Sequence, residues 1–474
     1  MFIAPTRDSK ILIYTIHRSY PWWREVGNNL GYDEAIVASC VRGDGDIDVV
    51  DDYYAAYHRL TREGALASPL LSVAQLDDVI ARCRVLRWLP HRQAAAMAMA
   101  MAEAFDKLLT SVNPGAILSF PIDRYVSDVL ERLAKARGIP YLELTPGVVP
   151  GTSMLLYRGR LITRKAEPSE EEIETATKII ANPVYVPSYL PSQARYSRTK
   201  FLKILGYFKI RGWVFKAISL AKRDPLNLHY LDSQAFLGHK PKWRDIRITT
   251  MFDADWRTRL DDFPIDRRLF IGLPLFPEAS IDYWIEPLEM IQFEDLVVDV
   301  ATAMATAGFL VLVKDHPLQF GFRQTELIDR LKAISGVVMV AYDVSGNEML
   351  DLVGVHFTTT GTLGLQTALF GKKSIVTESY YTTSADFIIL GSRAEIKDLP
   401  QRVIDTPAPA SLPERQRRII KQLLKGTINE DLYSRNGFNG RNPSPAIAAM
   451  GRVLGDMIET VTAKEDWHNR NQPT

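Results

Sequence analysis

The sequence predicts an α/β protein with two domains, each built on a parallel sheet that helices cover. Two observations carry this prediction. At 474 residues the chain exceeds a single hydrophobic core, which stops growing near about 250–300 residues. Within residues 246–400, short apolar runs alternate with helical patterns and give four successive β-α-β units. This alternation is typical of parallel sheets with helices on their faces.

Composition argues against nucleic-acid-binding, disulfide-rich and membrane-spanning classes of protein. The chain is 46% hydrophobic and 24% charged, as globular proteins are, and its net charge of +1 argues against a nucleic-acid partner. Cys40 and Cys83 form no disulfide framework or zinc spacing, so we expect buried thiols in a reducing compartment. We find no signal-peptide pattern and no run near the roughly 20 apolar residues of a membrane span. We therefore expect a cytoplasmic protein, either soluble or peripheral at the inner membrane.

The first domain is expected at residues 1–165. Its predicted strands are 10–17, 34–40, 116–120 and 141–144, and its predicted helices are 94–109 and 125–136. Asp123 follows the third strand, and Glu143 stands at the end of the fourth, so both are candidate functional carboxylates. The alternative for Asp123 is an exposed cap of the helix that follows. An acidic run at 44–52 lacks the closing glutamate of a calcium loop and is expected to be a solvated loop.

A connecting segment is expected at residues 166–245. It contains an acidic helix start at 168–172, a proline-rich part at 183–191 and a basic stretch at 195–223. The basic stretch holds nine Lys or Arg, no acidic residue and six aromatic residues, a pattern that suits an anionic membrane surface. The alternative is a solvated helical pair that packs its aromatic side chains inward and connects the domains.

The second domain is expected at residues 246–400. Its predicted strands are 269–275, 309–313, 337–341, 354–357 and 374–377, and its predicted helices are 287–307, 325–334, 347–352 and 363–370. Helices in residues 401–474 are expected to brace this domain or to cross back to the first.

Polar residues follow two of these strands. Lys314 and His316 come directly after strand 309–313 and offer a point charge and an imidazole donor, which suit an anionic leaving group. Thr360, Gly361 and Thr362 come between a strand and a helix. Free backbone N–H groups and the helix dipole make that helix start a candidate phosphate site. The alternative is an ordinary threonine cap.

A third strand end carries Glu278 and Ser280, which could accept ribose hydroxyls or hold a base. The alternative is a cap for the next helix. Loops at the carboxyl ends of strands bind ligands in α/β domains, so we expect the three loops to form one site. His356 lies within an apolar strand and is expected to be a hydrogen-bonded core histidine.

These motifs resemble those of bacterial capsular polysaccharide biosynthesis proteins. That family includes the Kdo transferase-like capsule proteins, and its His-Pro motif is similar to that of bacterial sialyltransferases. The resemblance rests on residues 273–280, 313–317, 360–368 and 371–373, and covers about residues 265–395. The chain differs from the family at two positions. Gln366 stands where the family often has glutamate, and Lys373 stands where it often has proline.

The resemblance implies a metal-independent GT-B glycosyltransferase without a cofactor, in which two Rossmann-like domains face each other across a cleft. Lys314 and His316 would contact the phosphate of a nucleotide-sugar donor, and loop 360–362 would cap it. If the glutamate that Gln366 replaces binds donor ribose in the family, the donor's identity stays open. The first domain would hold the acceptor and supply the catalytic base, Asp123 or Glu143.

We therefore predict a glycosyltransferase that moves a sugar, from CMP-Kdo or a similar CMP-linked acid, to a capsular or surface polysaccharide or its glycolipid acceptor. Two alternatives stay open. One is a nucleotide-sugar epimerase of the same two-domain shape, and the other is a non-catalytic partner in capsule assembly or export.

Overall fold

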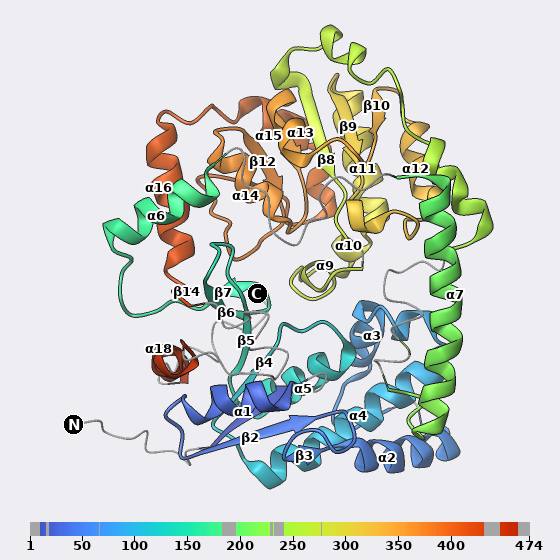
Figure 1. Cartoon of the computed structure of the whole chain (residues 1–474), viewed down its shortest axis with the longest axis vertical. Helices are drawn as coiled ribbons and strands as arrows, with labels where there is room; N and C mark the ends of the chain where they lie inside the picture. The colour runs from blue at the N-terminus through green and yellow to red at the C-terminus, as the bar shows by residue number, and fades with distance from the viewer. Residues whose placement is uncertain are drawn as a thin grey trace. The chain divides into compact units, whose positions relative to one another are not determined.

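A computed structural model describes residues 10–15, 19–65, 67–182, 196–227, 231, 241–275, 277–430 and 446–462. Predictions for residues 16–17, 183–191, 195, 276, 431–445 and 463–474 fall outside these ranges. The chain forms two compact units (Figure 1). Unit 1 contains Met1–Ser169 and Gln422–Thr474, and unit 2 contains Glu170–Lys421.

Unit 1 is built on a sheet with strand order β14-β6-β5-β4-β1-β2-β3, and β7 pairs with β6. The strands β1 to β5 pair in parallel, whereas β6 runs antiparallel to β5 and β14 runs antiparallel to β6. The bounds are β1 Lys10–Thr15, β2 Glu34–Ser39, β3 Ile47–Asp48, β4 Ala116–Ser119, β5 Tyr141–Pro146, β6 Ser153–Tyr157, β7 Arg160–Leu161 and β14 Thr427–Ile428. Chain order reverses between β1 and β4, as it does in dinucleotide-binding folds.

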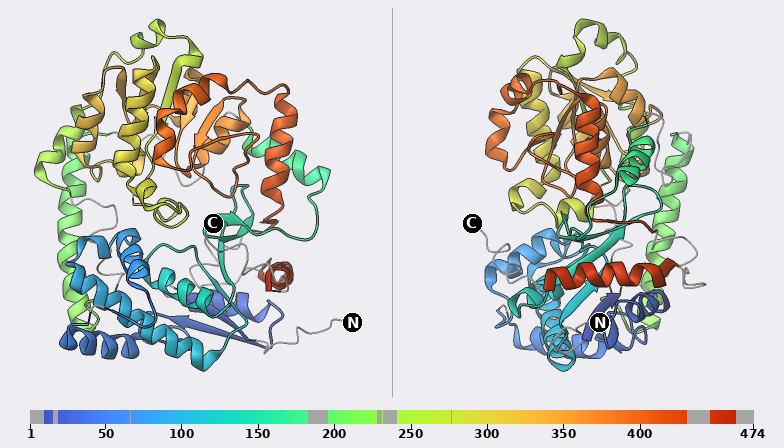
Figure 2. Two further views of the ribbon diagram at one scale, coloured as in Figure 1. Left: turned by 180° about the vertical axis from the view of Figure 1, so that it is seen from behind. Right: turned by 90° about the vertical axis from the view of Figure 1, so that its left-hand side faces the viewer.

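Helices cover both faces of this sheet (Figure 2). On one face α1 and α18 pack Trp22, Trp23 and Leu454 against the strands. On the other face the ring of Phe105 from α4 meets Tyr14 edge to face at 5.6 Å. The bounds are α1 Tyr20–Asn28, α2 Val50–Glu63, α3 Val73–Arg82, α4 His91–Val112, α5 Tyr125–Ala136 and α18 Ala446–Thr462.

Part of the acidic run is not a loop. Asp51 and Asp52 form the first turn of α2, where carboxylates are favoured by the helix dipole. Asp46 accepts the backbone N–H of Val37 at 2.8 Å, so this carboxylate is a turn anchor. Both cysteines are free thiols, Cys83 buried and Cys40 half-buried.

Unit 2 confirms the predicted α/β architecture. Among its described residues, six strands form one sheet in the order β10-β9-β8-β11-β12-β13, and all of them are parallel. The bounds are β8 Arg268–Gly272, β9 Leu310–Lys314, β10 Val337–Val340, β11 Val355–Phe357, β12 Lys373–Val376 and β13 Ile388–Ile389. The chain runs outward from β8 to β10 and then returns to the other side of β8 with β11. This reversal creates a crevice outside the strand ends at which open α/β sheets bind ligands.

Helices also cover both faces of the unit 2 sheet (Figure 1). One face carries α11, α12 and α15, and the other carries α13 and α14. The bounds are α6 Glu170–Ile180, α7 Arg198–Ala221, α9 Ala279–Asp282, α10 Leu288–Ile291, α11 Phe293–Thr306, α12 Thr325–Lys332, α13 Gly346–Leu352, α14 Thr362–Leu369, α15 Leu399–Asp405 and α16 Leu412–Leu424. Short 3₁₀ turns include η2 Trp243–Thr250 and η5 Pro317–Gln319.

The units differ in extent from the expected domains. Residues 170–245, expected as a connecting segment, belong to unit 2. The chain after α16 returns to unit 1, where it contributes β14 and α18. Within the described ranges, no helix combines the length and apolar character that crossing a bilayer requires.

Candidate functional site

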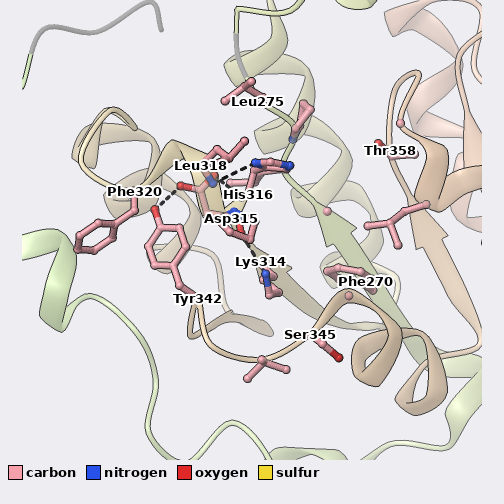
Figure 3. A pocket seen from close by; sticks show the side chains of 18 of the residues that line it. Phe270, Leu275, Lys314, Asp315, His316, Leu318, Phe320, Tyr342, Ser345 and Thr358 are labelled. Carbon is pink, nitrogen blue, oxygen red and sulfur yellow. Dashed lines mark hydrogen bonds between the residues drawn. The ribbon is translucent and has the colours of Figure 1, made fainter. Parts of the chain in front are cut away.

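A cavity of about 1430 Å³ lies at the point where the strand order of unit 2 reverses (Figure 3). Typical small-molecule pockets occupy roughly 300–1,000 Å³, so the space suffices for a nucleotide joined to a sugar. Its lining comes mainly from the loops after β8, β9, β10 and β11. The lining residues in these loops are 272–275, 278, 280, 314–318, 341–348, 358 and 360–363. The three loops expected to form one site therefore do share one cavity.

Lys314 ends β9 and lines the cavity with a side chain that is largely buried. Its ammonium Nζ donates to the backbone oxygen of Asp315 at 3.3 Å. Burial lowers the pKa of Lys314 to about 8, and the carboxylates of Asp315 and Asp343 oppose this shift. Most Lys314 side chains therefore carry a proton at pH 7. An ammonium has three donors, so two are left for a ligand.

His316 is held in one tautomer by the backbone. Its Nδ1 accepts the backbone N–H of Leu318 at 3.2 Å, in the turn that begins η5. The neutral ring must then carry its proton on Nε2. Burial lowers the pKa of His316 to about 4, with Asp315 opposing the shift and the cation Lys314 adding to it. At neutral pH the cavity thus receives an uncharged N–H donor.

Asp315, between these two residues, is occupied by structural contacts. Its carboxylate accepts from Nε and Nη2 of Arg323 at 3.0 and 2.8 Å and from the backbone N–H of His316 at 2.8 Å. It also accepts from the hydroxyl of Tyr342, a contact that Figure 3 shows as a dashed line. These contacts fix the loop that presents Lys314 and His316. Sequence reasoning did not assign this role, because Arg323 and Tyr342 become neighbours of Asp315 only in the fold.

The start of α14 adds backbone donors. Gly361 occupies the cap position, so no threonine caps this helix. The N–H groups of Thr362 and Leu363 have no partner in the part of the chain that the structure describes. A Cβ at Gly361 would lie 2.7 Å from Oγ1 of Thr358, which explains the glycine. These amides and the positive end of the helix dipole form an anion-binding arrangement.

Hydroxyl groups join the loops after β8 and β11. The hydroxyl oxygens of Ser280 and Thr360 lie 2.7 Å apart in a buried hydrogen bond. This bond connects the two strands between which the chain order reverses. Ser280 and Thr360 both line the cavity, but one hydrogen bond of each is already used within the protein.

Glu278 lines the cavity at the cap position of α9, and its side chain does not cap that helix. Its carboxylate has no hydrogen bond or ion pair with the described residues. Burial, with the nearby Asp282 carboxylate, raises the pKa of Glu278 to about 7. Glu278 is thus a carboxyl group that exchanges its proton near neutral pH. Gln366, in the second turn of α14, is nearly buried and also lines the cavity.

His356 lies in the core, as expected, but without the expected hydrogen bonds. Its side chain is fully buried, and neither ring nitrogen has a partner among the described residues. The ring packs against Phe270, and burial lowers the pKa of His356 to about 3.

Sequence reasoning missed the loop after β10. Tyr342, Asp343 and Ser345 all line the cavity from this loop. The signal was present, because the predicted strand 337–341 ends at these polar residues. Tyr342 also packs face to face with Tyr196, whose ring centroid lies 5.0 Å away. The aromatic pair forms part of the cavity wall.

In unit 1, Asp123 follows β4, beside the point where that sheet's strand order reverses. One oxygen of its carboxylate lies 3.3 Å from Nη2 of Arg84 and 3.3 Å from Nε of Arg124. Arg124, and not Asp123, is the cap residue of α5, so the alternative of a helix cap does not hold.

Glu143 lies inside β5 and not at its end, because pairing with β6 extends the strand to Pro146. Its carboxylate is fully buried and accepts the backbone N–H groups of Ile122 at 3.2 Å and Arg158 at 2.6 Å. Burial raises the pKa of Glu143 to about 7, while these hydrogen bonds oppose the shift. The geometry is that of a group that joins strands within the core.

The described ranges contain no cluster of three or more His, Cys, Asp or Glu side chains arranged to hold a metal ion.

Comparison with known proteins gives only distant matches. No family model matches the chain, and no curated protein matches it. Among solved structures, UDP-GlcNAc 2-epimerase from Methanocaldococcus jannaschii shares 11% identity over 87% of this chain and 98% of that chain, with a TM-score of 0.25. The β-Kdo 2,4-transferase KpsC of Thermosulfurimonas dismutans shares 13% identity over 64% and 78%, with a TM-score of 0.28. A glycosyltransferase from Rickettsia africae shares 10% identity over 98% and 100%, with a TM-score of 0.26. At these values the matches assign no activity to the chain.

Proposed function

We propose that unit 2 binds the nucleotide of an activated sugar and that the protein is a glycosyltransferase. One observation carries this proposal. The cation Lys314, the Nε2–H donor of His316 and the unpaired amides at the start of α14 line one cavity. Three donors of different kinds suit a phosphate better than they suit any neutral ligand.

The arrangement also suits the chemistry of transfer. When the bond between sugar and nucleotide breaks, negative charge grows on the departing phosphate. Donors that are fixed in advance stabilise that charge more in the transition state than in the ground state. Lys314 supplies a full charge, whereas His316 supplies a hydrogen bond at a position that η5 fixes.

Glu278 and Gln366 supply hydrogen-bond acceptors, which the three proposed phosphate-binding groups do not offer. A carboxylate and an amide oxygen in the same cavity accept hydrogen bonds from ribose or sugar hydroxyls. We assign them to the donor's hydroxyl groups, with Ser280 and Thr360 holding the loops together.

Transfer also needs a base that takes the proton of the acceptor hydroxyl. We propose Asp123 for this role in preference to Glu143, because the Asp123 side chain is 21% exposed whereas Glu143 is fully buried. Asp123→Asn is then expected to abolish transfer while leaving nucleotide binding by unit 2 unchanged.

The finer assignment rests on the motif resemblance. We propose a CMP-linked sugar acid such as CMP-Kdo as the donor, and a capsular or surface polysaccharide or its glycolipid precursor as the acceptor. The three-residue sequence Lys314-Asp315-His316, followed by Pro317, carries this choice of donor.

A nucleotide-sugar epimerase is the second candidate, and Glu278 is the observation that favours it. A carboxyl group with a pKa of about 7, in the cavity that would hold the sugar, is suited to removing and returning a proton. Such a reaction needs no acceptor.

The binding claim is tested by thermal unfolding with CMP, CDP, UDP and GDP in turn. At about 100 times its Kd, a nucleotide that binds only the folded protein stabilises it by roughly 2.7 kcal/mol. We expect one nucleotide to raise the Tm of the wild type and of the controls His91→Ala and Lys397→Ala, which change exposed side chains. We expect no rise in His316→Ala or Lys314→Ala. If no nucleotide stabilises the wild type, the proposed donor site is wrong.

The activity is tested by following the matching nucleotide-sugar by mass spectrometry, with and without glycan acceptors. Consumption that requires an acceptor indicates a transferase. An isomerised sugar without acceptor indicates an epimerase. Binding without turnover under both conditions would favour a non-catalytic role in capsule assembly or export.

A further inference from the structure

The outward face of α7 carries a continuous apolar stripe. Its members are Leu202, Gly206, Ile210, Trp213, Ala217 and Leu220, all exposed. Their spacing of three or four residues places them along one side of the helix. Trp213 is 76% exposed and Ile210 is 67% exposed, values that are unusual for such large apolar side chains.

The opposite side of α7 is committed to unit 2. Phe201 and Leu205 are buried in the main apolar core of that unit. Phe208 meets the ring of Phe322 edge to face at 5.8 Å. The expected helical pair is instead one continuous helix. The expected inward packing of aromatic side chains holds for this side of it, while Trp213 and Tyr207 are exposed. Packing within unit 2 therefore gives no reason for apolar residues in the exposed stripe.

The charges around the stripe have one sign. Residues 198–223 contain no acidic side chain and eight cations, namely Arg198, Lys200, Lys203, Lys209, Arg211, Lys216, Lys222 and Arg223. On the helix surface, Lys209 and Lys216 flank the stripe on one side and Lys203 on the other, and all three are exposed. Long lysine side chains beside an apolar stripe can extend their charges past it.

We propose that this face of α7 docks on an anionic lipid bilayer, with the stripe in the interfacial region and the flanking lysines at the lipid headgroups. An apolar stripe between cations, with tryptophan and tyrosine among the exposed side chains, is the arrangement of helices that lie in a membrane interface. A protein partner with an acidic apolar groove would satisfy the same charges. The bilayer is favoured because the cations recur along the whole helix and match a uniformly charged plane better than a groove.

This surface is distinct from the cavity and does not depend on the proposed glycosyl transfer. Substitutions at residues 209–216 are expected to leave the nucleotide-induced rise in Tm unchanged. Loss of membrane binding and loss of the donor site can therefore be told apart.

The test is co-sedimentation of the full chain with vesicles of phosphatidylcholine alone and of an equimolar mixture with phosphatidylglycerol. We expect binding to the mixture only, weakened by added salt because surface charges are screened. Lys209→Gln with Lys216→Gln should lower the partition coefficient by about fivefold for each lysine. Ile210→Ser with Trp213→Ser should abolish binding.

Matched controls change the same residue types elsewhere. Lys178→Gln with Lys397→Gln removes two exposed lysines of unit 2, and Val73→Ser with Trp88→Ser removes two exposed apolar side chains of unit 1. Both controls should bind the mixed vesicles like the wild type. The proposal is overturned by equal binding to both vesicle types, by no binding to either, or by wild-type binding of the α7 variants. It is also overturned if the protein dimerises without lipid and Ile210→Ser with Trp213→Ser restores the monomer, because the stripe then serves a second copy of the chain.

Discussion

Arg323 and Asp315 form an ion pair that is withdrawn from water. The guanidinium Nη2 lies 2.8 Å and Nε 3.0 Å from the same carboxylate oxygen, and the two side chains are 1% and 0% exposed. Arg323 also donates to the backbone oxygen of Pro274 at 2.5 Å, and Asp315 accepts from Tyr342. One buried pair thus joins the loops that follow β8, β9 and β10.

Removing one partner of this pair should destabilise unit 2 strongly. Arg323→Leu leaves the Asp315 carboxylate buried without its cation, a change that costs about 3–5 kcal/mol in comparable pairs. Arg330→Leu is the matched control, because its ion pair with Asp295 is exposed on both sides and should contribute less than about 1 kcal/mol. Urea unfolding of the two variants gives the comparison. If Arg323→Leu and Arg330→Leu lowered the unfolding midpoint equally, the buried ion pair would not be what stabilises these loops.

Lys314 gives a pH dependence to nucleotide binding. Its pKa of about 8 means that the ammonium is charged below pH 8 and loses its proton above it. A bound phosphate favours the charged form, so affinity should be highest below pH 8 and fall as pH rises, by at most tenfold per pH unit. The phosphate's own last pKa of about 6 lies below this range.

Titration calorimetry between about pH 7 and pH 9 measures this dependence. Lys314→Arg keeps its charge throughout, so its affinity should fall less than that of the wild type over the range. Any fall that remains in this variant comes from other groups in the cavity, such as Glu278 with its pKa of about 7. Lys314→Gln should bind weakly at every pH. A wild-type affinity that does not change across pH 8 would remove Lys314 from the phosphate site.

The sequence was sufficient to find the cavity but not the contacts that shape it. Lys314, His316 and Glu278 were predictable because each follows an apolar strand, and strand ends of a parallel sheet lie together. The clamp on Asp315 was not predictable, since Arg323 comes from a turn eight residues later and Tyr342 from another strand. Such contacts depend on the fold and leave no local pattern.

The same limit explains the errors in unit 1. Glu143 was expected at a strand end because the apolar run stops at Leu144, but β6 pairs alongside and extends β5. The strands β3, β7 and β14 have only two residues each, too few for any periodicity to show. Their existence depends on the neighbours with which they pair.

Gly364 should resist replacement although it lies in a helix. Alanine usually stabilises a helix by about 0.5–1 kcal/mol relative to glycine. A Cβ at Gly364 would lie 2.7 Å from Cγ1 of Val376 and 2.9 Å from the Tyr381 hydroxyl, so Gly364→Ala should cost roughly 1–3 kcal/mol. Gly206→Ala in α7 is the control, because nothing lies within 4 Å of its Cβ, and it should be neutral or stabilising. A stabilised Gly364→Ala, measured by thermal unfolding, would show that α14 can move away from β12.

His356 should make the protein less stable in mild acid. Its pKa is lowered from the ordinary 6.5 to about 3, so the unfolded chain takes up the proton first as pH falls. The contribution of His356 to the free energy of unfolding is therefore fully present above pH 6.5. It is lost on acidification, with a slope of at most about 1.4 kcal/mol per pH unit.

Other groups titrate in the same range, so the comparison must be made between variants. Glu143 and Glu278, with raised pKa values of about 7, change stability in the opposite direction. Burial favours their protonated forms, so their contribution to the free energy of unfolding falls as pH rises. His356→Leu removes only the histidine contribution. Its stability should fall less than that of the wild type between about pH 6.5 and pH 5, while the exposed-site control His91→Leu should follow the wild type. The free energy of unfolding, measured in urea, could instead change with pH by the same amount in the wild type, His356→Leu and His91→Leu. That result would mean that a water or an internal rearrangement already accommodates the protonated ring of His356.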